Sequence, residues 1–236
     1  MNRYLSYSKD LLTSILFISP FIILYETLCY FIFINKDYEI RNLADVFIRD
    51  RFYILGEISQ LFYVFILISA VIIYVIYNYD KYESYSFSVF YSSLMIIEGF
   101  ALSLILLFII NGFSVFESKY NFSSNPYFIN FYSSVGAGIW EEVFFRLFLF
   151  GFISYIIRFF FGNKFFSIFF ALIISSIFFS LFHYIGNLGE LFAINTFIIR
   201  FVAGVLLCLI YIKRGLGIAC ITHILYDVML FTIPLI

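Results

Sequence analysis

The sequence predicts an all-α fold, a polytopic transmembrane helix bundle of about seven spans. Hydrophobic residues make up 64% of the 236-residue chain, charged residues make up only 12%, and the mean hydropathy is +1.03. A water-soluble domain of this length would carry roughly twice that share of charged residues. The apolar residues also fall into runs of about 20 or more, which is the length that a helix needs to cross a bilayer.

Seven apolar runs are long enough to be spans. In chain order they cover residues 11–35, 53–78, 87–112, 130–158, 164–184, 191–212 and 215–236. The first run is about 25 residues long, which fits a spanning helix better than the core of a cleavable signal peptide. Between the first two runs lies the most charged stretch, 37–52, where Leu43, Val46 and Phe47 fall at spacings of three and four. That spacing predicts an amphipathic helix in the membrane interface.

The polar loop 113–129 divides the chain into two parts. Residues 1–129 form an N-terminal part of transmembrane helices and loops without a marked polar motif. Residues 130–236 form the part that carries the polar motifs. Arg158 and Lys164 flank the turn 159–163, and Lys213 and Arg214 form the turn 213–214. This predicts that both turns face the cytoplasm of a multi-pass protein of the cell membrane.

Composition also excludes some classes of function. The formal net charge of −1 argues against nucleic acid as a partner. The cysteines are scattered through apolar runs and form no CxxC pair, so they are expected to be core residues rather than disulfides or metal ligands. These residues are Cys29, Cys208 and Cys220.

Ionisable residues inside three of the predicted spans are the main functional signal. Such residues cost a few kcal/mol each in hydrocarbon, so they are rarely present without a role. The fourth span carries Glu141, Glu142 and Arg146, the fifth ends near His183, and the last carries His223 and Asp227. His183 and His223 are the only histidines in the chain. Together the six residues predict a buried polar site.

Helical geometry separates the two adjacent glutamates. Glu142 and Arg146 are four positions apart and share a face, which predicts a structural ion pair. Glu141 points about 140° away from Arg146 around the helix and has no local partner. A carboxylate in apolar surroundings is suited to act as a general base. We therefore expect Glu141 to be the base, with Glu142 and Arg146 in a supporting role.

Two imidazoles and a free carboxylate from three helices can converge on one water molecule. Glu141 would deprotonate the water while His183 holds it, and His223, with Asp227 beside it, would donate to the oxyanion. The same groups could instead bind zinc, and the residues alone leave this choice open. At 1.5 Å per residue, Glu141 and His223 lie near the middle of the bilayer. His183 lies near its surface, so it reaches the others only if its helix is tilted or extends past Tyr184.

The order and spacing of the motifs resemble one known family. Glu141-Glu142-x-x-x-Arg146, Phe179-x-x-x-His183 and His223-x-x-x-Asp227, on separate apolar helices, are similar to the motifs of the CPBP family of CAAX-prenyl-protease-like and bacteriocin-processing intramembrane proteases. The resemblance covers about residues 130–230.

The resemblance implies an intramembrane endopeptidase that needs no cofactor, in which the first motif glutamate and the second-motif histidine activate water. The last motif would stabilise the oxyanion. The chain departs from the family at Asp227, where asparagine is frequent. A carboxylate donates a hydrogen bond only when it is protonated, so Asp227 would instead orient His223.

The implied substrate is a peptide or protein segment that enters from the lipid bilayer, either prenylated or leader-type. Three alternatives compete with a metal-free protease. One is a zinc-dependent protease built on the same residues, and another is a non-catalytic bacteriocin-immunity or scaffold protein. A haem protein with two histidine ligands would leave both glutamates unexplained.

Overall fold

In the computed structural model the described residues are 3–36, 39–51, 59–83, 85–114, 127–186 and 189–232. Within these ranges the secondary structure is helical and contains no strand, so the predicted all-α class is confirmed. The helices, in chain order, are α1 (Arg3–Lys9), α2 (Leu11–Phe33), α3 (Leu43–Arg49), α4 (Ser59–Tyr77), α5 (Tyr79–Tyr82), α6 (Val89–Ser114), α7 (Tyr127–Glu142), η2 (Val143–Phe150), α8 (Gly151–Phe161), α9 (Lys164–Phe182), α10 (Ile194–Arg214) and α11 (Leu216–Thr232).

Five helical segments of the described chain are long and apolar enough to cross a membrane. They are Leu11–Phe33, Val89–Gly112, Tyr127–Phe161, Lys164–Phe182 and Ile194–Arg214. The predicted count of seven is not confirmed. The apolar helices in the other two predicted spans are shorter, Phe65–Tyr77 and Leu216–Phe231. The start of the predicted span 53–78 and most of the predicted loop 113–129 lie outside the described residues.

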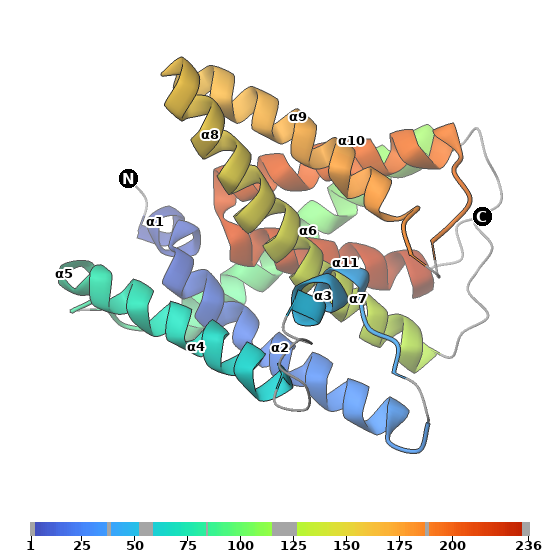
Figure 1. Ribbon diagram of the computed structural model, residues 1–236, viewed down its shortest axis with the longest axis horizontal. Coiled ribbons are helices and arrows are strands. Elements are labelled where there is room, and N and C mark those ends of the chain that lie inside the picture. The colour runs from blue at the N-terminus through green and yellow to red at the C-terminus, as the bar shows by residue number, and fades with distance from the viewer. Residues whose placement is uncertain are drawn as a thin grey trace.

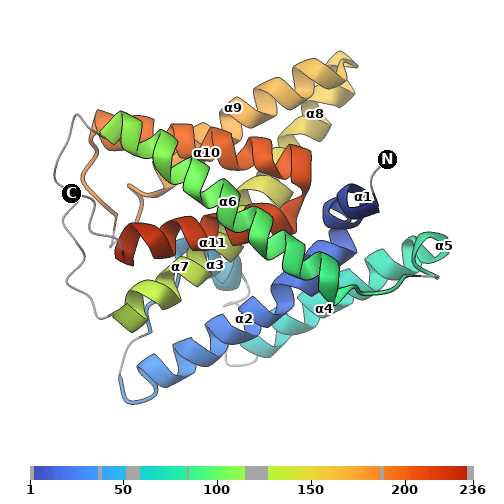
Figure 2. The same ribbon diagram turned by 180° about the vertical axis from the view of Figure 1, so that it is seen from behind.

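The short helix α11 is the centre of the bundle. It packs against α2, α6, α7 and α10, and Figures 1 and 2 show these helices on different sides of it. Most of its side chains between Leu216 and Ile224 are buried. The α8–α9 and α10–α11 turns lie on the same side of the bundle as α1, to the right in Figure 2. These are the two turns that the orientation prediction assigns to the cytoplasm.

The helix that carries the first polar motif contains a π-helical segment. The run Tyr127–Phe161 is continuous, but the eight residues of η2 that follow Glu142 are wound as a π-helix. The Ser175 hydroxyl of α9 donates to the backbone carbonyl of Phe145 at 2.8 Å, inside this segment. π-Helical turns are frequent at functional sites. Here the segment begins directly after the two glutamates.

Two glycines let the site-bearing helices approach one another closely. A Cβ on Gly138 would lie 2.6 Å from the backbone nitrogen of Ile224, so glycine is required where α7 crosses α11. Gly138 stands one turn before Glu142, and Ile224 is next to His223. A Cβ on Gly204 would lie 3.0 Å from the Phe179 ring, where α10 meets α9. These contacts bring the three polar motifs to one level of the bundle.

The charged stretch 37–52 contains a helix, but its packing differs from the prediction. Of the three apolar residues expected to face the membrane, Leu43 and Val46 are half-buried and Phe47 is exposed. The completely buried residues of α3 are instead Ala44 and Asp45. The helix packs against α7 and α4 rather than presenting one apolar stripe. Ion pairs with Arg41 and Arg49 compensate the buried charge of Asp45, and the interfacial position of this helix stays a prediction.

Candidate functional site

The Phe179 ring is the point at which the three polar motifs meet. It is 3% exposed, and its centroid lies 5.3 Å from that of His183 and 6.0 Å from that of His223. The Arg146 guanidinium lies over the same ring, 4.3 Å from its centroid. A single aromatic side chain of α9 thus contacts one residue from each motif. Phe179 was part of the sequence motif, but its role as a shared contact surface was not predicted.

Glu142 is completely buried between a cation and an imidazole. Its Oε1 atom lies 3.1 Å from Nη1 of Arg146 and 2.8 Å from Nδ1 of His223. Arg146 is itself 1% exposed and donates from Nη2 to the Gly204 carbonyl at 3.4 Å. The contact with Arg146 follows the predicted four-residue spacing. The contact with His223 was not predicted, because it joins two helices and residues 81 positions apart.

The Glu142 contact determines how His223 is protonated. An ionised carboxylate can only accept hydrogen bonds, so the Nδ1 atom that faces it carries a proton. The other ring nitrogen, Nε2, lies 3.6 Å from Oδ2 of Asp227, which is longer than a hydrogen bond. His223 and Asp227 therefore share a helix face as predicted, with Nε2 left for a further partner. The imidazole is held between two carboxylates.

His183 is the C-terminal cap of α9, and its ring is held by its own helix. Its Nδ1 atom lies 3.0 Å from the Phe179 carbonyl. A carbonyl only accepts, so Nδ1–H donates and Nε2 of the neutral ring carries no proton. A neutral ring of this kind presents a hydrogen-bond acceptor to the site.

The helix of His183 does not extend past Tyr184, which was one of the two ways for this residue to reach the site. α9 ends at Phe182. It runs obliquely to α11 in both views of the bundle (Figures 1 and 2). Phe179 of α9 contacts His223 of α11, and His183, one turn further along the chain, contacts the same ring.

Glu141 has no ion pair among the described residues and is instead bound by a neutral amide. It is 7% exposed, and Oε1 accepts a hydrogen bond from Nδ2 of Asn42 at 2.8 Å. Asn42 directly precedes α3 and caps it. Sequence reasoning missed this residue. An asparagine just before an apolar helical segment is a common N-cap, but that signal gives no indication of a partner 99 positions away.

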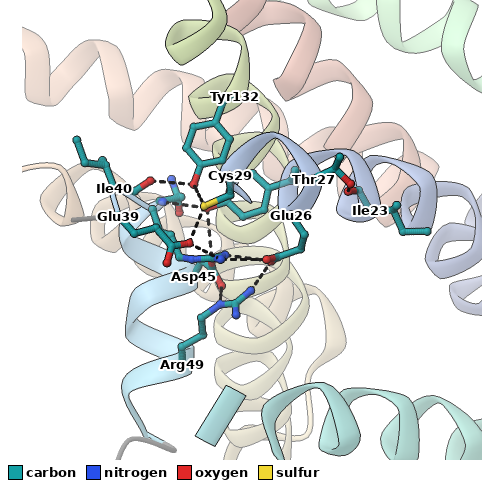
Figure 3. A network of polar contacts seen from close by, with 12 residues as sticks. Ile23, Glu26, Thr27, Cys29, Glu39, Ile40, Asp45, Arg49 and Tyr132 are labelled. Carbon is teal, nitrogen blue, oxygen red and sulfur yellow. Dashed lines mark hydrogen bonds and ion pairs between the residues drawn. The ribbon is translucent and has the colours of Figure 1, made fainter. Parts of the chain in front are cut away.

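A network of charged side chains fixes α3 beside the site (Figure 3). Arg41 Nη2 lies 3.0 Å from Glu26 Oε2 of α2, and Arg41 Nη1 lies 3.2 Å from Asp45 Oδ2. Arg49 pairs with the same two acids, and its Nε atom lies 2.6 Å from Asp45 Oδ1. Glu39 also pairs with Arg41. We name these five residues the α3 ion cluster. It explains how a strongly charged segment can lie against apolar helices.

Metal ligation was left open by the sequence. Over the described ranges, no three side chains of His, Cys, Asp or Glu gather in an arrangement that could hold a metal ion. His223 Nδ1 is in contact with Glu142 Oε1 at 2.8 Å, and its Nε2 lies 3.6 Å from Asp227 Oδ2.

Comparison with known proteins agrees with the motif resemblance. Residues 123–229, slightly less than half of the chain, match the family model described as Rce1-like, type II CAAX prenyl endopeptidase Rce1-like. The matched range contains all three polar motifs. It confirms the resemblance to the CPBP family and indicates a membrane-embedded protease. No curated protein and no solved structure gives a significant match.

Proposed function

We propose that this protein is an intramembrane endopeptidase that hydrolyses peptide bonds with a water molecule activated by Glu141 and His183. The observation that carries the proposal is the meeting of the three motifs around Phe179. The match to a family of CAAX prenyl endopeptidases supports the reaction class. The five helices able to span a membrane support a substrate that is itself associated with the bilayer.

Glu141 and His183 are suited to divide the two protons of one water between them. The neutral His183 ring offers an unprotonated Nε2, and Glu141 offers a carboxylate that has no cation paired to it in the described structure. A water that donates to both groups turns its lone pairs away from them and toward a substrate carbonyl. Glu141 takes the proton as the new C–O bond forms, in the manner of a general base.

His223 is the candidate group for stabilising the tetrahedral intermediate. Because its Nδ1–H is committed to Glu142, its Nε2 can donate to the oxyanion only as an imidazolium. The carboxylates of Glu142 and Asp227 stabilise that cation, which gives Asp227 a role without requiring it to donate. When the C–N bond breaks, the proton held by Glu141 passes to the leaving amine. Atoms and charges then balance for hydrolysis.

In this mechanism the water is activated without a metal. Each histidine uses Nδ1 for a contact within the protein, His183 with a carbonyl and His223 with a carboxylate, so only Nε2 of each ring remains for another partner. Glu142 is already shared between Arg146 and His223. A zinc-dependent enzyme would need three of these groups on one ion. Elemental analysis after chelation separates the two mechanisms.

We further propose that the substrate is a prenylated or strongly apolar peptide that enters the bundle laterally, in the cell membrane. Glu141 and His223 lie near mid-bilayer by rise per residue. A lipid chain partitions there already, with a gain of about 0.8 kcal/mol per buried CH₂. Cleavage of a CAAX-type and a leader-type peptide, measured side by side, distinguishes these two substrate classes.

The test is a cleavage assay in liposomes with a farnesylated CAAX peptide and a hydrophobic leader peptide. Wild-type protein is compared with Glu141→Gln, which keeps the size of the side chain and removes the base. Cleavage by the wild type alone is the expected result. If both the wild type and Glu141→Gln leave both peptides intact, the proposal fails. The alternative of a non-catalytic scaffold or immunity protein is then favoured.

A further inference from the structure

We infer that Asn42 is a positioning residue for Glu141 and that the α3 ion cluster exists to hold it in place. The inference rests on the proposed function, since it explains how the proposed base is oriented. It concerns a segment of the chain that lies outside the matched range 123–229.

The orientation of the Asn42 amide is determined by its two partners. Its Oδ1 accepts from the backbone N–H of Ala44 at 2.9 Å, and its Nδ2 donates to Glu141 at 2.8 Å. A backbone N–H can only donate and a carboxylate can only accept, so exchanging the oxygen and nitrogen of the amide would break both bonds. The backbone N–H of Asn42 also donates to the Tyr25 hydroxyl at 3.2 Å. Asn42 thus contacts α2, α3 and α7 in a single arrangement.

A neutral donor is the appropriate partner for a general base. Arg146 pairs with Glu142, so that carboxylate is already engaged by a cation. The Asn42 amide holds one oxygen of Glu141 without adding a positive charge. The other oxygen remains for the water. This difference in partner explains why two adjacent glutamates can have different roles.

Helix α3 has only seven residues, too few to be stable by its own hydrogen bonds. Its position depends on contacts with the neighbouring helices. Tyr25 joins the two systems, because its hydroxyl accepts from Asn42 and donates to Asp45 Oδ2 at 3.2 Å. The Tyr25 ring stacks on Tyr132 of α7, with centroids 4.8 Å apart.

Tyr132 ties down the segment that leads into α3. Its hydroxyl donates to the Ile40 carbonyl at 2.8 Å (Figure 3). The start of α3 is therefore attached to both α2 and α7, two residues before Asn42 and at Asn42 itself. Together with the α3 ion cluster, these contacts leave the amide little freedom to move away from Glu141.

The decisive variants are Asn42→Ser and Asn42→Asp. Serine and aspartate cap a helix about as well as asparagine, so both variants preserve the start of α3. Serine is too short to reach Glu141, and aspartate replaces the donor with a second carboxylate. We expect kcat on the farnesylated peptide to fall at least about tenfold in both variants, with KM changed by less than about twofold.

Asn163 provides a matched control. It caps α9 by accepting from the Phe166 backbone N–H at 3.1 Å, at the end of the bundle where α8 turns into α9. Asn163→Ser should leave kcat unchanged. If Asn42→Ser keeps the wild-type kcat while Glu141→Gln abolishes it, Asn42 is only a helix cap and the inference is overturned, although the proposed function stands.

A stability measurement tests the contact independently of catalysis. Asn42→Asp should lower the melting temperature in the wild-type background, because it places two carboxylates in contact. In the Glu141→Gln background the same substitution should cause little loss, since glutamine can donate to the new carboxylate. An equal loss in both backgrounds would overturn the inference, whether or not the protein cleaves any peptide.

Discussion

Arg146→Ala should destabilise the fold strongly, because it removes the cation from a completely buried carboxylate. Breaking a buried ion pair on one side costs about 3–5 kcal/mol. Glu142 is 0% exposed, but His223 still faces it at 2.8 Å after the substitution. We therefore expect the lower end of that range, about 3 kcal/mol. The lost contact of the guanidinium with the Phe179 ring adds up to about 2 kcal/mol.

The assay is thermal unfolding in detergent, with two reference variants. At about 2–4 °C per kcal/mol for a chain of this size, the midpoint of Arg146→Ala should fall by roughly 6–20 °C. Glu141→Gln should stay within a few degrees of the wild type, because glutamine still accepts from Asn42. The double variant Glu142→Gln/Arg146→Met should recover much of the loss, since no unpaired charge remains. Equal midpoints for Arg146→Ala and Glu141→Gln would refute the reasoning.

Three further predictions concern catalysis. Glu141→Gln and His183→Ala should each abolish peptide cleavage in liposomes while the protein remains folded and inserted; a Glu141→Gln variant with most of its turnover would show that the base is misassigned. Chelation should leave turnover unchanged, and elemental analysis should find no zinc in proportion to activity; zinc that tracks activity would instead identify a metalloprotease. Adding a prenyl or acyl chain to a test peptide should raise kcat/KM by about tenfold or more; a hydrophilic peptide that is cleaved equally fast would contradict lateral entry from the membrane.

Contacts within one helix were predictable from the sequence, because spacing alone determines which side chains are neighbours. The pairs Glu142–Arg146 and His223–Asp227 are of this kind. The specific atom pairs between helices were not predictable. The Glu142–His223 contact depends on the close crossing of α7 and α11 at Gly138, and periodicity carries no information about which helices cross.

The contact of the 37–52 stretch with Glu141 was also not predictable from the sequence. Its charged residues and the spacing of its apolar residues predicted an interfacial helix, because charged side chains are usually exposed to water. In the structure Arg41 and Arg49 compensate Asp45 and Glu26 across two helices, and the charged segment packs against α7, where Asn42 contacts Glu141. The count of seven spans is not confirmed for a related reason: α11 is apolar and surrounded by other helices, and its 17 described residues are few for a span.

The α3 segment bears on whether the motif-bearing part of the chain is a self-sufficient module. The sequence divides near residue 130 by composition, and the family match begins at 123. Yet Asn42 donates to Glu141 and Tyr25 stacks on Tyr132, so contacts made by the first part complete the surroundings of the proposed base. A fragment that begins at residue 123 would retain every motif residue but lose Asn42, whose amide donates to Glu141. Co-expression of the two parts as separate chains, rather than truncation, is the way to ask which of them carries the activity.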